Sequence, residues 1–322
     1  MSSKVIKNLP IRDVFGITLK ELGKINKKIF AISPDLKAAT KLSYFFKEFP
    51  NRSIETGIAE ANAIGIAAGI ALSGLKPVIS SFGAFLTGKN VEIRTSISFN
   101  NANVIIAGTH GGLIGPDGPS QAGLQDIAVM RSIPNMCVYQ PATAIETKKI
   151  LEFSIKSNKP IYIRISRQVN KEFYTNNYNF IDGNPVVIDK NYKDGIIISS
   201  GNTLQHCYEA KEKLKLIGKN LGLINIPSIK PLNKNKLKNL IKKTKRIFTV
   251  EDHNIYGGLG SVILESISDM ENKPKVFIHG LKDIFIQSDD VKNLYKYYGL
   301  DKNGIFKFIK KNLIKSVKKK EN

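Results

Sequence analysis

The 322-residue sequence contains no tryptophan and only two cysteines. Cys137 and Cys207 lie in aliphatic or helical surroundings, with no Cys-x-x-Cys or Cys/His spacing near them. Such spacing is the sequence signal of a zinc site, and a disulfide framework is indicated by a larger set of cysteines. The sequence therefore predicts neither, and the scarcity of thiols fits a reducing cytoplasm best.

Long hydrophobic runs are also missing. Lysines interrupt the N-terminal residues, which lack the roughly 7 to 15 apolar residues of an export signal. No segment approaches the ~20 apolar residues that cross a bilayer. We therefore expect a cytoplasmic protein without a membrane partner.

Acidic residues are few: 27 Asp and Glu stand against 49 Lys and Arg, which gives a net charge of +22. Such a charge can indicate a nucleic-acid partner. However, only seven of the basic residues are Arg, and the lysines are spread along the chain without interleaved RNA-binding aromatics. We expect no nucleic-acid function, and we interpret Lys315 to Lys320 as a solvated tail.

The length suffices for two domains. Apolar patterns predict strands that alternate with helices, which is typical of doubly wound parallel sheets. We predict an α/β protein with two such domains, at residues 1–180 and 181–322, joined by a poorly periodic linker at 168–192. Predicted strands are 28–32, 76–81, 103–108, 135–139, 160–165, 195–200, 221–226, 246–250 and 275–278, and predicted helices are 11–25, 40–49, 125–132, 144–157, 204–217, 234–244 and 260–270.

One apolar helix carries an acid near its start. Residues 52–69 form a short strand-like run that ends at Gly57, followed by a helix of small and aliphatic residues that contains Glu60. A carboxylate there should be largely dry, so it must be paired, protonated or functional. A capping box is the structural alternative, but Thr56 and Glu60 are four residues apart instead of three.

This stretch, Ile58-Ala59-Glu60-Ala61-Asn62, resembles the opening of the pyrimidine-binding helix in the transketolase family. The resemblance continues from Arg12 to about Gly304. It implies that Glu60 is catalytic and hydrogen-bonds N1′ of the aminopyrimidine of the cofactor thiamine diphosphate. It also implies that Phe85, in Phe82-Gly83-Ala84-Phe85, stacks on that ring, whereas Phe82 either shares the cofactor site or packs in the core.

The resemblance also indicates three phosphate-binding residues. Arg12 and Ser43 are predicted at helix N-termini, where anions are favoured; the residues alone favour a surface cation and an N-cap, and the resemblance reverses that preference. Arg167 ends a strand in Ile165-Ser166-Arg167, and its guanidinium suits bidentate phosphate contact. All three match the family's residues for the substrate's terminal phosphate.

A Gly- and Pro-rich loop follows the aliphatic strand at 103–108. Ligands bind at the carboxyl ends of such strands in α/β proteins. By resemblance, His110 serves catalysis and substrate binding, Asp117 contacts substrate, and Gln121 contacts cofactor. The segment between His110 and Asp117 is one residue shorter than usual in the family, which bears on the placement of His110.

The turn from Glu251 to Gly260 lacks the third glycine of a dinucleotide fingerprint, because Ile263 stands at that position. It resembles instead the transketolase C-terminal domain, which we expect to be structural and interfacial.

The family's Gly-Asp-Gly segment, which binds the cofactor diphosphate through Mg²⁺, is absent from the sequence. The resemblance therefore implies the C-terminal subunit of a split transketolase, with no metal ligands of its own. We expect an N-terminal partner subunit that carries the diphosphate and Mg²⁺ site, a heterotetramer, and sugar-phosphate substrates. Alternatives are a deoxyxylulose-phosphate synthase relative, a 2-oxo acid dehydrogenase β subunit, or a catalytically silent partner.

Overall fold

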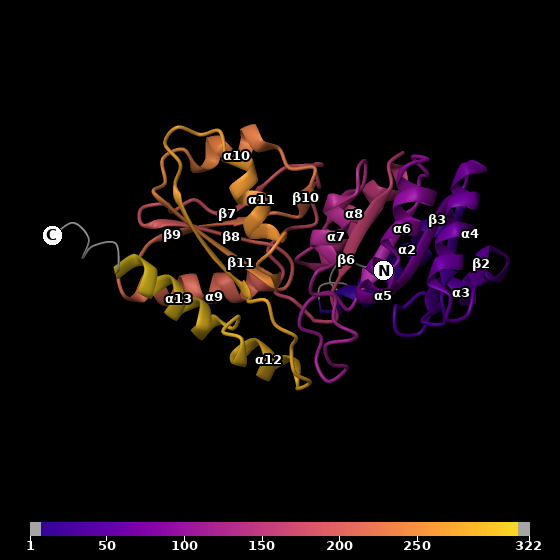
Figure 1. Cartoon of the computed structure of the whole chain (residues 1–322), viewed down its shortest axis with the longest axis horizontal. Helices are drawn as coiled ribbons and strands as arrows, with labels where there is room; N and C mark the ends of the chain where they lie inside the picture. Colours follow the sequence, from indigo (N-terminus) through magenta and orange to yellow (C-terminus); the bar gives the residue numbers. More distant parts are fainter. Residues whose placement is uncertain (1–7, 315–322) are drawn as a thin grey trace.

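The computed structural model describes residues 8–314. Two α/β domains lie side by side along the long axis of the molecule (Figure 1). The predicted tail at 315–320 lies outside the described residues. No helix within 8–314 has the length and hydrophobicity to cross a membrane.

The first domain is built on a seven-stranded sheet with the order β10-β5-β6-β4-β3-β1-β2. Its strands run parallel, except for β10. The strands are β1 (Ile29–Ser33), β2 (Ser53–Glu55), β3 (Lys76–Phe82), β4 (Ile105–Thr109), β5 (Cys137–Tyr139), β6 (Ile161–Ile165) and β10 (Ser228–Lys230). The helices are α2 (Ile11–Ile25), α3 (Ser43–Glu48), α4 (Glu60–Leu72), α5 (Gly83–Thr87), α6 (Asn90–Glu92), α7 (Asp126–Ser132) and α8 (Ala144–Lys156), with the 3-10 turn η1 (Pro50–Arg52) and the π-helical turn η2 (Ile93–Ser98).

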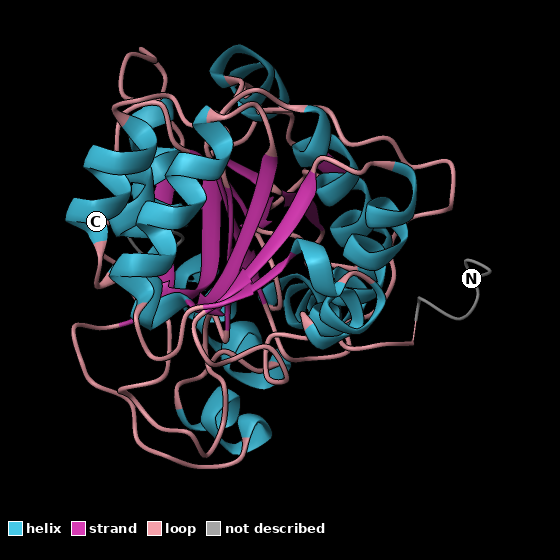
Figure 2. Cartoon of the chain, turned by 90° about the vertical axis from the view of Figure 1, so that its right-hand side faces the viewer, coloured by secondary structure: helices cyan, strands magenta, loops and turns pink. Residues whose placement is uncertain are grey.

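Helices cover both sides of these strands (Figure 2). All the residues of β3, β4 and β6 are buried. Strands covered on both faces need apolar side chains on both, which explains their continuous aliphatic runs.

The second domain has a five-stranded sheet of order β12-β11-β8-β9-β7, in which only β7 runs antiparallel to its neighbour. Its strands are β7 (Val186–Asp189), β8 (Gly195–Ser199), β9 (Leu221–Asn225), β11 (Arg246–Asn254) and β12 (Lys275–Leu281). Its helices are α9 (Thr203–Leu216), α10 (Lys234–Ile241), α11 (Leu259–Ser266), α12 (Val291–Tyr297) and α13 (Lys302–Ile314). Two doubly wound domains are thus confirmed.

Two strands depart from the sequence prediction. β7 lies inside the segment predicted as linker, so that prediction was wrong for residues 186–189, while the irregular part of the segment is packed through Asn170, Tyr174 and Phe180. β10 belongs to the second half of the chain but pairs with β5 of the first sheet. Both strands are short and lie at sheet edges, so their patterns are weak. The boundary at 180/181 stays a prediction.

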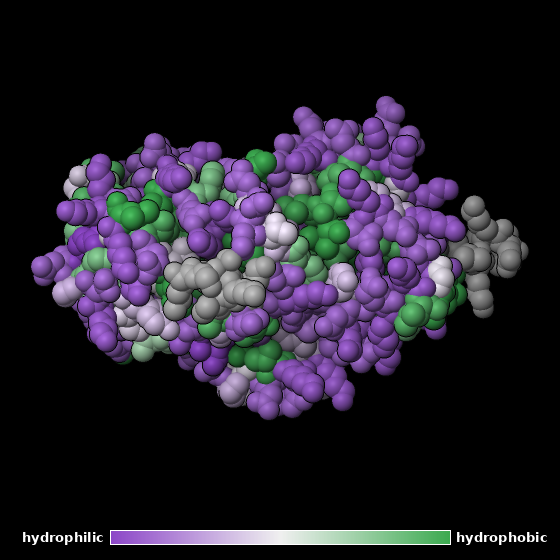
Figure 3. Space-filling view, turned by 180° about the vertical axis from the view of Figure 1, so that it is seen from behind, coloured by the Kyte–Doolittle hydropathy of each residue, from purple (hydrophilic) through white to green (hydrophobic). Residues whose placement is uncertain are grey.

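The surface seen from behind is mostly hydrophilic and is interrupted by separate hydrophobic patches (Figure 3). This distribution agrees with a lysine-rich composition.

A buried carboxylate joins the two domains. Glu146 of α8 accepts hydrogen bonds from the Ala142 backbone N–H (2.7 Å), the Tyr178 hydroxyl (3.0 Å) and Nδ2 of Asn225 on β9 (3.0 Å). Burial raises the pKa of Glu146 to about 7, although these hydrogen bonds act in the opposite direction. The folded protein therefore retains a proton that the unfolded chain loses at lower pH.

Glu146→Gln tests this arrangement. A raised folded-state pKa means that the contribution to stability is present below about pH 4.5 and is lost as pH rises through about 7. We expect the fall in the free energy of unfolding from pH 5 to pH 8 to shrink in the variant, by an amount on the order of 3 kcal/mol. Urea unfolding at several pH values measures it. Glu152→Gln, on the same helix but partly exposed, is the control, and identical pH profiles for wild type and Glu146→Gln would contradict the assignment.

Candidate functional site

The site lies at the carboxyl ends of β3, β4 and β6, which are neighbours in the first sheet. β3 leads to Phe82 and Phe85, β4 leads to His110, and β6 leads to Arg167. The first turn of α2 brings Arg12 to the same place, because the Ile11 N–H donates to the Gln168 carbonyl (3.0 Å). The topology therefore gathers residues far apart in sequence.

His110 has a left-handed backbone (φ 59°) and is 2% exposed. Its ring lies 3.7 Å, centroid to centroid, from the ring of Phe82. The Thr109 hydroxyl donates to the Ser81 carbonyl (3.2 Å), so its oxygen accepts from Nδ1–H of His110 (2.9 Å). This pairing leaves Nε2 of His110 as a hydrogen-bond acceptor.

The imidazole is neutral at physiological pH. Burial first, and then the nearby charges of Arg167 and Arg12, lower the pKa of His110 to about 3. A neutral imidazole can accept a proton or a hydrogen bond from a substrate hydroxyl.

Arg12 and Arg167, the arginine pair, lie close enough for their charges to interact. Burial lowers the pKa of Arg12, and Arg167 lowers it further against the opposing effects of Asp13 and Asp117. Arg12 donates from Nη1 to the Ala39 carbonyl (3.2 Å), while its buried Nε has no hydrogen-bond partner. Two positively charged guanidinium groups at close range, one of them with an Nε–H that makes no hydrogen bond, favour the binding of an anion between them.

Asp117 contacts this pair directly. Its carboxylate accepts a hydrogen bond from Nη1 of Arg167, which also donates to the Ile114 carbonyl (3.3 Å). Gln121 is half-buried farther along the same loop. His110, Asp117, Arg12 and Arg167 are thus brought together as the resemblance implied.

Among the hydrogen bonds of residues 8–314, none joins Ser43 to the arginine pair. Ser43 is exposed at the start of α3, in a hollow lined with Lys20, Lys41 and Lys47, and its hydroxyl donates to the Lys37 carbonyl (3.3 Å). Lys41, which has a left-handed backbone, contacts the residue next to Arg12: its Nζ lies 3.1 Å from Oδ1 of Asp13. A phosphate role for Ser43 stays a prediction without a contact that supports it.

Glu60 begins α4 and is half-buried in this chain. Its Oε1 accepts from the Ser81 hydroxyl (3.3 Å). The carboxylate is therefore only partly shielded from water in the single chain, because the outer face around α4 is open: Ile58 is 86% exposed and Gly65 has no atom near its Cβ position. Ala59 is the N-cap and makes no side-chain cap, so the capping-box alternative is excluded.

The two phenylalanines differ in exposure. Phe82 is buried against His110, whereas Phe85 is half-buried, and their rings stack at 5.3 Å. Phe85 thus has a face available for a flat ligand beside the strand end that supports Glu60.

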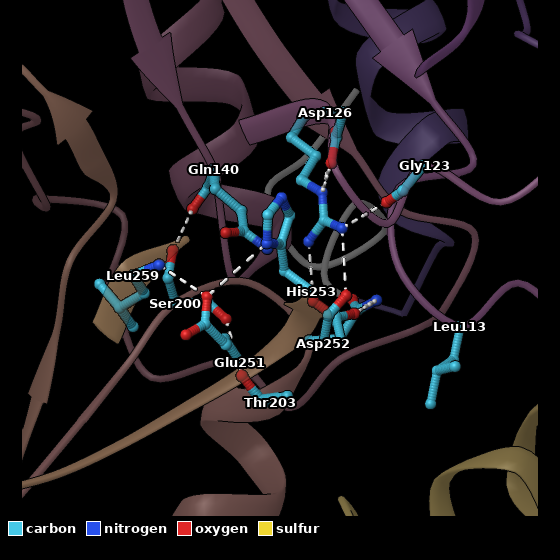
Figure 4. Close-up of polar contacts among 12 residues, drawn as sticks. Leu113, Gly123, Asp126, Gln140, Ser200, Thr203, Glu251, Asp252, His253 and Leu259 are labelled. Carbon is cyan, nitrogen blue, oxygen red and sulfur yellow. Dashed lines mark hydrogen bonds and ion pairs between the residues drawn. The ribbon is translucent and has the colours of Figure 1, made fainter. Parts of the chain in front are cut away.

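Sequence reasoning missed Arg164 of β6. Its 2%-exposed side chain donates to Asp126 (Nε to Oδ2, 3.0 Å) and to Asp252 of the second domain (Nη1 to Oδ1, 2.7 Å). Figure 4 shows Asp126, Gly123 and Asp252 around this guanidinium. Burial lowers the pKa of Arg164, but the two aspartates more than offset it, so the pKa is raised. An arginine within the apolar strand Ile161–Ile165 was the available signal, because a buried charge requires a partner.

Within residues 8–314, no cluster of three or more His, Cys, Asp or Glu side chains is arranged to hold a metal ion.

A parallel α/β domain with a polar site at its strand ends, followed by a second doubly wound domain, defines a two-domain, doubly wound α/β protein. Residues 7–171 match the family model of the transketolase pyrimidine-binding domain, and residues 185–305 match the transketolase C-terminal domain. The chain belongs to the transketolase family.

Its relatives include both short and long chains. It is 36% identical to a transketolase C-terminal section of Methanocaldococcus jannaschii over 95% of this chain and 96% of that one, and 34% identical to a subunit of the apulose-4-phosphate transketolase of Phocaeicola vulgatus over 93% and 97%. It is also 32% identical to 1-deoxy-D-xylulose-5-phosphate synthase of Clostridium tetani, of which it spans 50%.

A solved structure described as a split-gene transketolase, an inactive β4 tetramer, matches with a TM-score of 0.85 and 33% identity over 95% of this chain and 99% of that one. The transketolase of Campylobacter jejuni matches with a TM-score of 0.80 at 20% identity, over 94% of this chain and 46% of that one. At 20% identity, the match to the Campylobacter jejuni transketolase shows a similar fold and nothing further.

The protonation state of His110 can be tested by nitrogen-15 NMR. We expect a neutral Nδ1–H imidazole from pH 8 to pH 5, because its pKa lies near 3. The spectrum of His110→Gln assigns the signal. Thr109→Val removes the acceptor of Nδ1–H and should shift the tautomer toward Nε2–H, whereas a titration between pH 6 and 7 in the wild type would contradict the burial argument.

Proposed function

We propose that this chain is the C-terminal subunit of a split, thiamine-diphosphate-dependent transketolase. The enzyme moves a two-carbon ketol unit from a ketose phosphate to an aldose phosphate. The arginine pair carries the proposal, because two guanidinium groups held together with an unused Nε beside a neutral histidine suit a phosphorylated sugar.

The residues present fit one end of the cofactor. Glu60 offers a half-exposed carboxylate, and Phe85 offers a half-buried ring; with Gln121 they would hold the aminopyrimidine. When bound, thiamine diphosphate supplies the carbon nucleophile that carries the two-carbon unit. Its diphosphate and Mg²⁺ require ligands from another chain.

The chain's own groups then have separate tasks. Glu60 would hold the proton that a bound pyrimidine ring nitrogen exchanges, and Ser81 orients its carboxylate. His110 accepts a hydrogen bond from a sugar hydroxyl at Nε2. Arg12 and Arg167 bind the terminal phosphate, and Asp117, which accepts a hydrogen bond from Arg167, contacts the sugar.

An N-terminal subunit completes the enzyme as a heterotetramer in the cytoplasm. The open face of α4 supports this, because Glu60 would become dry only when another surface covers it. Relatives of the same length are described as a transketolase section and a transketolase subunit, and the similar β4 tetramer is described as inactive.

Deoxyxylulose-phosphate synthase activity is the second candidate, because synthases are as similar to this chain as transketolases are. A 2-oxo acid dehydrogenase β subunit binds no sugar phosphate and would not need the arginine pair. A catalytically silent subunit would not need the carboxylate of Glu60. Turnover of pyruvate in place of a ketose donor would favour the synthase.

Arg167→Ala tests the substrate class. A charge-assisted contact to phosphate contributes about 1.5 to 3 kcal/mol, so the KM for xylulose 5-phosphate should rise roughly 10- to 100-fold in the reconstituted enzyme. The kcat should fall less, because the phosphate lies far from the reacting carbon. Glycolaldehyde as acceptor should be little affected, and Arg131→Ala, which removes an arginine that pairs with Glu265 and the Gly257 carbonyl, is the control. Equal losses on phosphorylated and plain substrates would contradict the phosphate site.

Glu60→Gln tests the cofactor and the partner together. Calorimetry with Mg²⁺ and thiamine diphosphate should give little heat with this chain alone and a clear signal after the N-terminal subunit is added. In the complex, Glu60→Gln should lower kcat by ~10²-fold or more, because no other carboxylate replaces its proton exchange. The exposed Glu48→Gln is the control. Tight stoichiometric binding by the isolated chain would disprove the split-enzyme proposal.

A further inference from the structure

The loop that carries the site residues belongs physically to the second domain. This site loop, residues 111–123, begins directly after His110 and includes Asp117 and Gln121. Its apolar side chains are buried in the second domain's core rather than the first domain's; they include Leu113, Ile114 and Ala122, which pack with Leu204, Val250 and Tyr295. The second domain therefore contributes to the shape of a site that contains none of its own side chains.

The two ends of the site loop close into a neck formed by Gly111, Gly112 and Gly123. The Gly112 N–H donates to the Gly123 carbonyl (3.0 Å), and the Gly123 N–H donates to the His110 carbonyl (3.1 Å). These hydrogen bonds tie the backbone of His110 to the far end of the loop. Movement of the neck would therefore move His110.

The neck rests directly on the ion pair between Arg164 and Asp252. Arg164 donates from Nη2 to the Gly123 carbonyl (2.7 Å), and a Cβ at Gly111 would lie 2.6 Å from its Cγ. At Gly112, where φ is +89°, a Cβ would collide with Oδ2 of Asp252. Only glycine allows this approach, so the neck takes its position from the ion pair.

Asp252 is held rigidly. Its Oδ2 accepts from the Tyr295 hydroxyl (2.8 Å) and from Nδ2 of Asn202 (3.4 Å), while Oδ1 and the backbone carbonyl accept from Arg164. The charge is buried and fully paired, and such a network rigidifies its surroundings.

The outer part of the site loop is supported from both domains. Gln168 donates to the Leu113 carbonyl (3.1 Å), and Ser288 of the second domain donates to the Pro116 carbonyl (2.6 Å). Asp117, which contacts Arg167, follows Pro116 immediately. The segment Pro116–Asp117 therefore contacts both the second domain, through Ser288, and the proposed sugar site, through Arg167.

The geometry points to Asp252 as a positioning residue: through Arg164 it fixes the neck of the site loop, and with it the placement of His110 and Asp117 for a phosphorylated sugar. The sugar-binding part of this inference rests on the proposed function, whereas the positioning of the loop does not. The C-terminal domain is accordingly a determinant of substrate affinity.

Hydrogen exchange of the full-length chain, followed by mass spectrometry, tests the positioning. Asp252→Asn removes the charge while it keeps the side-chain shape, and we expect amides of the site loop to exchange at least tenfold faster. Glu251→Gln is the matched control: it alters the adjacent buried carboxylate, which accepts from the Leu259 and Gly260 amides of α11, and should leave the site loop unchanged. Tyr295→Phe removes one hydrogen bond to Asp252 and gives a milder form of the same change if Asp252→Asn does not fold.

Kinetics in the complex with the N-terminal subunit give the second readout. The KM for xylulose 5-phosphate should rise about 5- to 10-fold in Asp252→Asn, with a smaller change in kcat. Arg164→Lys, which retains the charge, should restore part of the affinity lost in Arg164→Gln.

The outcomes separate the two proposals. Unchanged loop exchange in a folded Asp252→Asn variant would overturn the positioning role. Faster loop exchange with an unchanged KM would overturn the link to substrate affinity. An inactive wild-type complex on ketose phosphates would refute the proposed function, and the exchange result would still decide whether Asp252 positions the loop.

Discussion

The buried charge of Arg164 is the constraint on which the rest of the structure depends. A guanidinium removed from water is tolerated only where carboxylates and carbonyls pair all of its donors. Asp126 supplies one partner from the first domain and Asp252 supplies the other from the second, with the Gly123 carbonyl between them. Because neither domain alone satisfies this arginine, the two domains adopt one fixed relation, and the site forms where they meet.

That relation explains the consecutive residues Glu251, Asp252 and His253 at the end of β11. Successive side chains of a strand point to opposite sides. Glu251 accepts the first amides of α11, His253 accepts the Ala128 N–H (3.4 Å) through Nε2, and Asp252 points to Arg164. One strand end thus supports its own helix and holds the first domain. The second domain is interfacial, and its interface reaches the site loop; a purely structural role for it stays a prediction.

The charges of the site follow from the same packing. His110 is neutral because burial and two arginines disfavour its cation, while the arginine pair keeps its positive charge close to the sheet edge. The neutral imidazole of His110 can accept a hydrogen bond from a hydroxyl group, and the arginine pair can bind a phosphate, so together they suit a hydroxylated, phosphorylated ligand. Glu60 differs from these residues because packing within the chain does not fix its surroundings. It is half-buried at an open helix face, and its proposed chemistry depends on a surface that another chain provides.

The sequence by itself determined the elements and their order. Continuous aliphatic runs such as Ile105–Thr109 and the periodic helix Ile11–Ile25 reflect local burial, so the positions of strands and helices and the two-domain class could be predicted from the sequence. The family motifs around Glu60, His110 and Arg167 could be recognised in the same way. Only the tertiary structure decided which of these residues meet. It placed Arg12 beside Arg167, directed the Ser43 hydroxyl to the Lys37 carbonyl, added β10 to the first sheet, and joined Arg164 to Asp252, 88 residues away. The physical reason is that pairing of a buried charge, edge-strand pairing and exposure at an unpartnered helix face are properties of the assembled surfaces, which no local pattern encodes.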